Sequence, residues 1–330
     1  HNAKLTKRQI LLAWNTRLLP AIRYPMEAVC LSEKQWNNIL APAWKTLLPK
    51  LGIVSSVRRE ARYGNIEQFG FNFVNPFHTQ TAIQIRSFAT EIQNESYAGS
   101  LIIETIKHLK LETTTCGSLF QQDPSILQAI VSKGWLFNLW KTMYQLNVSI
   151  IEKFGVIRPQ RKGDKGLVQV FIEQGYRGEE LRQLNCMRLY MKVLLLSDIT
   201  DASGKYISHN AWRDHKAEVL ISHRWPGRPP NIPRSWWKKW NQFLSAIAPR
   251  RRLRRRLEEW WHDAHNWRWW YSKEGGILID KKDKKTYKSI NNRSRRAHKF
   301  TESLEDIPQE GDLIRVSIWY ANGHITSTLE

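Results

Sequence analysis

The sequence predicts a mainly α-helical protein with small antiparallel β elements towards its C-terminus, which makes it α+β overall. Two observations predict this fold class. Apolar residues recur with a period near 3.6 over most of the first 200 positions, and alternating apolar runs appear mainly after about position 268. At 330 residues, of which 42% are hydrophobic, the chain is long enough for two or three units with real cores.

Two capped helices are expected first. Thr6 can cap a helix that we expect to end at Pro20, because proline interrupts helical hydrogen bonding. Ser32 and Gln35 have the spacing of a capping box, which starts a second helix expected to end at Pro49. In both stretches the apolar residues fall on one helical face, so both helices are expected to pack against a core.

Further helices follow on the same grounds. Asn75-Pro76 opens one, since proline is favoured in the first helical turn, and Ser96 starts another. Residues 63–73, between the helix that ends near Pro49 and the helix that starts at Asn75-Pro76, are expected to form a short strand or an extended turn. Later segments are a basic turn over 158–166 and helices over 124–131, 135–146, 167–174 and 179–196.

A helical hairpin rich in tryptophan and arginine is expected next. Ser235 can cap its first helix, which Pro249 ends. The second helix would run over 250–264, with Leu253 and Leu257 on its buried face and arginines on the others. Three tryptophans of the region are expected in the core: Trp236, Trp240 and Trp261.

The C-terminal part has the pattern of short strands. They are expected over 269–271, 276–280, 286–290, 314–320 and 324–328. Asn322-Gly323 separates the last two runs, and an Asn-Gly pair between alternating runs is typical of a β-hairpin.

These elements divide the chain into four expected units. They are a helical unit over 1–110, a helical connection over 111–223, a basic Trp/Arg-rich unit over 224–300 and a β-hairpin tail over 301–330. The proline-rich stretch 225–233 is the expected linker, running as polyproline II. Because the chain begins with histidine, we expect it to be an internal piece of a longer polypeptide, truncated at the tail as well.

Positive charge and tryptophan are concentrated in the same part of the chain. The net charge is +21, and residues 204–300 hold 25 Lys+Arg, 8 Asp+Glu and ten of the 16 tryptophans. Residues 1–203 carry a net +9 and residues 301–330 a net −5. Surplus cations beside surplus indoles favour an anionic partner that can also stack, which is the chemistry of a nucleic acid.

The candidate nucleic-acid-binding residues are cations and indoles from this region. They are Arg250, Arg251, Arg252, Arg254, Arg255, Arg256, Lys281, Lys282, Lys284, Lys285, Trp267, Trp269 and Trp270. Arginine makes bidentate contacts to phosphate, and the three tryptophans could form a stacking platform for single-stranded bases. Alternatively, the arginines are a solvated face, or the region docks an acidic protein partner or an anionic membrane surface. No charge-free apolar run is long enough to span a membrane.

Catalytic and metal-binding signatures are scarce. The familiar nucleotide-binding, serine-hydrolase and zincin motifs do not occur, and no Asp-Asp pair exists to hold two metal ions. His262 and His265 share a helical face but have no third ligand nearby, so stacking or phosphate contact is favoured over metal binding. Asp198 and Asp201 are expected to act in capping and turns. We therefore expect no catalytic residue, no bound metal and no cofactor in this chain.

The three cysteines are Cys30, Cys116 and Cys186, and they lie tens of residues apart. Such spacing fits neither a metal pair nor a disulfide framework. A reducing intracellular compartment, the cytoplasm or the nucleus, is therefore expected.

Several short segments occur in a familiar order. They are LPAIRYP at 19–25, LPKLGI at 48–53, Tyr63-Gly64, EELRQLNCMRLY at 179–190, LSDIT at 196–200, Trp225-Pro226 and RSW at 234–236. Together they resemble the region just downstream of the polymerase domain in reverse transcriptases of retrotransposons from microbial eukaryotes. The similarity is collinear and extends to about residue 290.

The resemblance implies the thumb and connection of a retroelement polyprotein, with the thumb in residues 1–110. The parent would be an RNA-directed DNA polymerase, but this chain lacks the aromatic-x-Asp-Asp motif that binds metal, so it is expected to be inactive alone. A divalent metal is then expected only in the upstream polymerase domain. Implied partners are RNA and DNA, as an RNA–DNA duplex or template strand, together with the rest of the polyprotein.

Two details bear on the resemblance. Where the family tends to have Gly-x-Gly this chain has Gly70-Phe71-Asn72, and asparagine tolerates the positive φ that such a turn needs. A ribonuclease H-like domain beginning in the C-terminal strands would need a carboxylate in its first strand, and residues 314–318 hold none. The second observation disfavours an enzymatic role for the tail.

Overall fold

The computed structural model divides the chain into two compact units, His1–Thr105 with Lys133–Ile150 and Ile106–Ser132 with Ile151–Glu330. The described residues are 6–218, 223–227, 231–260, 268–272, 277–292, 295–303, 313–316, 318–321 and 324–327. This division differs from the four units expected from the sequence. Residues 133–150 belong to the first unit, and all residues after them belong to the second unit.

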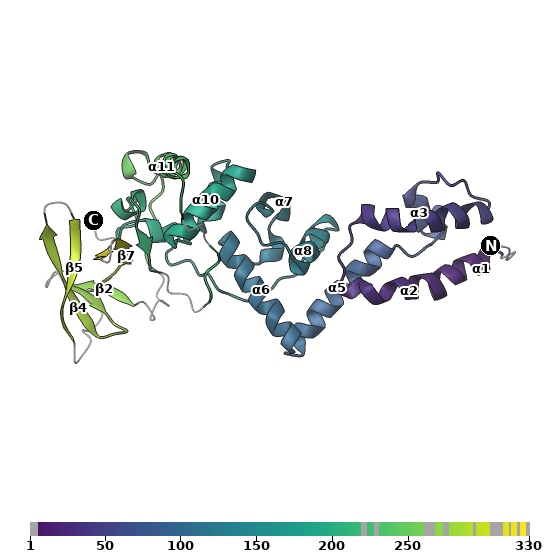
Figure 1. Ribbon diagram of the computed structural model, residues 1–330, viewed down its shortest axis with the longest axis horizontal. Helices are drawn as coiled ribbons and strands as arrows, with labels where there is room; N and C mark the ends of the chain where they lie inside the picture. Colours follow the sequence, from purple (N-terminus) through teal and green to yellow (C-terminus); the bar gives the residue numbers. More distant parts are fainter. Residues whose placement is uncertain are drawn as a thin grey trace. The chain divides into compact units, whose positions relative to one another are not determined.

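The first unit is helical throughout its described part (Figure 1). Its elements are α1 (Lys7–Ala13), the π-helical turn η1 (Trp14–Leu18), α2 (Leu19–Arg23), η2 (Tyr24–Glu27), α3 (Glu33–Lys50), α4 (Arg59–Tyr63), η3 (Ile66–Gln68), α5 (Pro76–Gln93) and α8 (Trp135–Gln145). Helix α6 (Tyr97–Thr113) begins in the first unit and ends in the second.

The helix starts expected at Thr6, Ser32 and Asn75 are confirmed, whereas the cap expected at Ser235 is wrong, because its helix begins at Arg234 with Pro233 as N-cap and without a side-chain cap. Thr6 and Ser32 each form a reciprocal capping box with the glutamine three residues later. The Asn75 side chain accepts the Phe77 N–H at the start of α5. These caps act within a few residues of chain, which is why the sequence predicts them.

The helix end expected at Pro20 is wrong. The chain passes through the π turn, where the Leu19 N–H donates to the Trp14 carbonyl five residues back, and Pro20 then lies at the start of α2. A widened turn and a first-turn position both accommodate a residue that has no N–H. The end expected at Pro49 is nearly right, because α3 stops one residue later.

Tryptophan and phenylalanine form the core of the first unit. The Trp14 and Trp44 rings lie 4.3 Å apart between centroids, and Phe73 meets both edge-on at 5.4 and 5.1 Å. All three side chains are buried. Asn72, just before Phe73, has φ of 54°, as expected for the turn at residues 70–72.

The second unit contains further helices and a β-sheet. Its helical elements are the end of α6, η4 (Leu119–Gln121), α7 (Pro124–Leu127), α9 (Leu167–Glu173), α10 (Gly178–Met191), η5 (Ser197–Ile199), η6 (His209–Trp212), α11 (Arg234–Ile247) and η7 (Pro249–Arg251). Helix α10 is shorter than expected because Lys192 adopts the left-handed conformation that ends it.

Helix α11 packs its apolar face into this unit through aromatic contacts. Phe243 lies 4.7 Å from Phe171 of α9 and 5.6 Å from Trp240, between ring centroids. Trp240 is fully buried and donates its indole N–H to the Ala211 carbonyl, so its expected core position is confirmed. Trp236 is only half-buried, beneath the Arg182 guanidinium, and Trp261 lies outside the described residues.

The strands form a single antiparallel sheet (Figure 1). They are β1 (Lys216–Ala217), β2 (Trp269–Ser272), β3 (Ile277–Asp280), β4 (Lys285–Asn292), β5 (Arg295–Ser303), β6 (Leu313–Arg315), β7 (Ile318–Ala321) and β8 (His324–Ser327). Their order is β1-β7-β8-β5-β4-β3-β2-β6.

The C-terminal residues belong to this sheet and do not form a separate tail. Strand β6 pairs with β2, while β7, only two residues further on, pairs with β8 and β1. The β7–β8 hairpin is confirmed, with Ala321 opposite His324, although Asn322-Gly323 itself lies outside the described residues. The predicted fold class, mainly α with antiparallel β elements, is therefore confirmed.

Candidate nucleic-acid interface

The arginine run does not continue the helical hairpin, so the second helix expected over 250–264 is wrong over residues 250–260, and residues 261–264 lie outside the described residues. Helix α11 ends at Ile247, and Pro249 opens a single 3₁₀ turn. Arg250 and Arg251 then have φ of 53° and 67°, which is outside the right-handed helical region. A helix here would also place like charges one turn apart, which is unfavourable.

Residues 250–257, which we call the arginine segment, are held by backbone hydrogen bonds to an earlier loop. The Ile207 N–H donates to the Arg251 carbonyl at 2.8 Å, and the Leu253 N–H donates to the Lys205 carbonyl at 2.9 Å. Both bonds connect positions more than forty residues apart in the sequence. Backbone pairing with this loop thus replaces the expected helical hydrogen bonds.

The side chains of this segment divide by polarity. Leu253 and Leu257 are buried, with 7% and 2% of their surface exposed. The six arginines are all exposed: Arg250, Arg251, Arg252, Arg254, Arg255 and Arg256. The ion pairs between described residues involve none of these six. The Arg256 Nε donates to the Ser203 carbonyl at 3.1 Å. The buried leucines therefore fix a strip of chain whose arginine side chains are exposed.

A buried arginine anchors the end of the segment. Arg161 is 4% exposed, and its Nε and Nη1 donate to the Glu258 and Ala202 carbonyls at 2.8 and 2.9 Å. Its guanidinium lies 4.7 Å from the centre of the Trp260 ring. Gly204 makes room for this arrangement, because a Cβ there would lie 2.7 Å from the Arg161 Cζ.

Two lysines extend the cationic surface. Lys162 is exposed and exchanges backbone hydrogen bonds with the chain just after the arginine segment, and Lys205 pairs with the segment itself. Tyr206 beside Lys205 is 40% exposed. We call the arginine segment with these two lysines the basic surface. Two exposed carboxylates, Glu258 and Glu259, bound it at one end.

The positive charge of the lysine-rich turn between β3 and β4 is more closely balanced by acidic side chains than that of the arginine segment. Lys282 and Lys284 are exposed, and the Lys281 Nζ lies 4.1 Å from the centre of the Trp270 ring. Lys285 begins β4 and is half-buried. No hydrogen bond or ion pair between described residues joins this turn to the arginine segment.

Arg268 forms ion pairs with three carboxylates at or near the same turn. It pairs with Asp280 at 2.6 Å, with Glu218 at 2.7 Å and with Asp283 at 2.9 Å. Burial pushes the pKa of Asp280 up, but hydrogen bonds and charge from Arg268 outweigh it and the pKa lies below its usual value. The turn is therefore a weaker candidate for phosphate contact than the arginine segment.

The stacking platform expected from the tryptophans is not formed by the two that the structure describes. Trp269 and Trp270 are 2% and 3% exposed. Trp269 packs with Leu278, Val316 and Ile318 in the core of the sheet. Trp267 lies outside the described residues.

Acidic residues in this unit have structural roles. Asp198 accepts the Leu194 and Leu195 N–H groups at 2.8 and 2.9 Å, and Asp201 accepts backbone N–H groups of the 203–206 turn, as expected for capping and turn residues. Burial raises the pKa of Asp198 to about 6, and the charge of Asp164 adds to this shift.

Within the described part of the chain, no three or more histidine, cysteine, aspartate or glutamate side chains lie close enough together to hold a metal ion. His262 and His265 lie outside the described residues. Burial raises the pKa of all three cysteine thiols, that of Cys116 to about 11, which disfavours thiolate ligands.

The sequence did not identify Arg161, Lys162 or Lys205 as part of this surface. The basic turn over 158–166 is a local signal for the first two, but nothing local indicates that it lies against residues 258–260.

In the described residues, no helix is long and apolar enough to cross a membrane.

Comparisons with protein-family models, with curated proteins and with solved structures find no match to this chain.

Proposed function

We propose that this chain is a non-catalytic nucleic-acid-binding segment of a retrotransposon reverse transcriptase polyprotein, holding an RNA–DNA duplex or a template strand. One observation supports this most strongly. Six exposed arginines lie on a short strip of chain whose backbone is hydrogen-bonded and whose two leucines are buried. Such a strip presents guanidinium groups with little backbone entropy left to lose on binding.

The geometry fits a phosphate backbone. Residues 252–256 span at most about 17 Å, which is the axial rise of about five phosphates on one duplex strand. Adjacent Cα atoms of a chain are about 3.8 Å apart, less than the Debye length of about 8 Å at physiological salt, so charges on adjacent arginines are only partly screened from one another. Binding an anion would therefore relieve repulsion among the arginines as well as form new contacts.

The parentage is supported by the collinear segments that resemble reverse transcriptases. In that context the chain would contact nucleic acid downstream of a polymerase domain that supplies the catalytic carboxylates and the divalent metal. The basic surface contacts phosphate and does not read sequence, which suits a polymerase that must copy any template.

The salt dependence of binding tests this function. We expect the slope of log affinity against log salt on an RNA–DNA duplex to flatten by about 2–3 when Arg251, Arg254 and Arg255 are all replaced by Gln, since each lost phosphate contact changes it by about 0.9. Fluorescence anisotropy of a labelled duplex at several salt concentrations measures the slope.

A charge-matched variant provides the control. Lys133, Lys141 and Lys153 are exposed and lie outside the basic surface, so replacing these three by Gln removes the same charge and should leave the slope nearly unchanged. Equal effects of the two variants would mean that net charge alone drives binding. Saturable binding to an acidic polypeptide, with no affinity for duplex or single strand, would favour the alternative of an acidic protein partner.

A further inference from the structure

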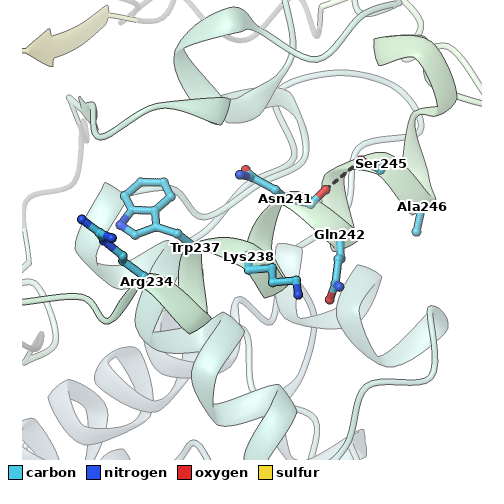
Figure 2. A pocket seen from close by; sticks show the side chains of 7 residues that line it. All are labelled: Arg234, Trp237, Lys238, Asn241, Gln242, Ser245 and Ala246. Carbon is cyan, nitrogen blue, oxygen red and sulfur yellow. Dashed lines mark hydrogen bonds between the residues drawn. The ribbon is translucent and has the colours of Figure 1, made fainter.

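A shallow groove lies on the outer face of α11, and none of its residues belongs to the basic surface (Figure 2). It is lined by Arg234, Trp237, Lys238, Asn241, Gln242, Ser245 and Ala246. These positions recur every three or four residues and so share one helical face. The opposite face, with Trp240, Phe243 and Leu244, is the one packed into the unit. The groove is therefore held on a well-anchored helix.

The chemistry of the lining is aromatic, cationic and amide. Trp237 is half-buried, whereas Arg234 and Lys238 are exposed, and none of the seven lining residues is acidic. The Arg234 side chain lies beside the Trp237 ring in Figure 2. A flat indole flanked by two cations can accept a stacked base and the phosphates on either side of it.

We infer that this groove binds one unpaired base of a single-stranded nucleic acid. The base stacks on Trp237, while Arg234 and Lys238 contact the adjacent phosphates. This inference rests on the proposed function and deepens it. It adds a single-strand site on α11 to the phosphate-binding basic surface.

Photo-crosslinking locates the base directly. A single-stranded RNA containing 5-iodouracil is bound to the full chain, irradiated and digested with trypsin. Cleavage after Arg234 and Lys238 releases residues 235–238, a tetrapeptide with only two tryptophans. We expect fragmentation to place the crosslink on Trp237. A crosslink confined to other peptides would overturn the inference.

Matched substitutions test the energetics. Trp237→Leu should weaken single-strand binding about tenfold, as expected for the loss of one stacked base, whereas Trp237→Phe should retain most of the affinity. Trp236→Leu is the control, because that indole lies beneath Arg182 and does not line the groove. Thermal melting by circular dichroism verifies that each variant is folded. Equal losses for the two Leu variants would overturn the inference.

Binding to duplex separates this inference from the proposed function. Trp237→Leu should leave duplex affinity and its salt slope unchanged, while the triple Gln variant of the basic surface changes both. If that triple variant behaves as expected but Trp237→Leu binds single strands normally, the groove site is wrong and the proposed function stands. If the unmodified chain binds neither duplex nor single strand, both are wrong.

Discussion

One buried arginine gives a structural role to the segment at 179–190, which is among those that resemble reverse transcriptases. Arg188, in the segment at 179–190, is fully buried and donates to the Leu111 and Glu112 carbonyls at the end of α6 and to Asn185. Burial lowers its pKa to about 9. The guanidinium caps carbonyls that the helix leaves unpaired, so Arg188 stabilises the second unit.

Asp198 should make stability depend on pH. Its folded pKa of about 6 lies above its usual value near 4, so between these values the folded state binds more protons than the unfolded state. The contribution of this group is fully present below about pH 4 and is lost as the pH rises through about 6.

Asp198→Asn should remove this slope, because an amide oxygen can still accept the Leu194 and Leu195 N–H groups but carries no charge. At pH 7 we expect the variant to be more stable by about 1–3 kcal/mol, from the size of the pKa shift. Chemical denaturation of both proteins between pH 4 and 8 measures the difference. Parallel stability curves would show that Asp198 titrates normally.

The arginine segment shows how an element can be fixed by distant backbone. Its leucines and its hydrogen bonds to residues 204–207 replace the helix that local periodicity predicts. Strand β5 is a similar case, since the sequence over 295–303 is polar and basic and yet pairs along its length with β4. In both elements the backbone partner decides the conformation.

Leu257→Ala should loosen the arginine segment. Removing a buried leucine side chain costs about 2–5 kcal/mol where the site cannot collapse, and here that loss acts mainly on the attachment of the segment. We expect trypsin to cut within residues 250–256 faster in the variant than in the unmodified protein, as followed by mass spectrometry. Val54→Ala, at an exposed position of the first unit, is the control. Equal cleavage rates would contradict the burial of Leu257.

At the scale of the molecule, each unit has its own core. The first is built on the Trp14, Trp44 and Phe73 rings, and the sheet of the second on Trp269 with Leu278. The C-terminal strands complete that sheet, because β6 is a neighbour of β2 and β8 is a neighbour of β5.

Deleting residues 301–330 tests this arrangement. We expect the melting temperature to fall and the near-ultraviolet circular dichroism of the buried tryptophans to weaken, since Trp269 loses Val316 and Ile318. An independent tail, as the sequence suggests, would leave both measurements unchanged.

The sequence by itself determined the local features of this protein. The cap at Thr6, the capping box at Ser32, the start of α5 at Asn75 and the β7–β8 hairpin were predicted correctly, because each depends on residues within a few positions of one another. It also indicated which stretch of chain is richest in cations. Charge composition does not depend on conformation.

Only the tertiary structure decided how the candidate surface is built. The conformation of the arginine segment depends on hydrogen bonds and packing between residues far apart in the chain. The same holds for its anchor Arg161 and for the burial of Trp269 and Trp270. The groove on α11 likewise becomes visible only once the opposite face of the helix is known to be buried. Periodicity records which residues share a face of an element, whereas non-local contacts decide which faces remain open to a ligand.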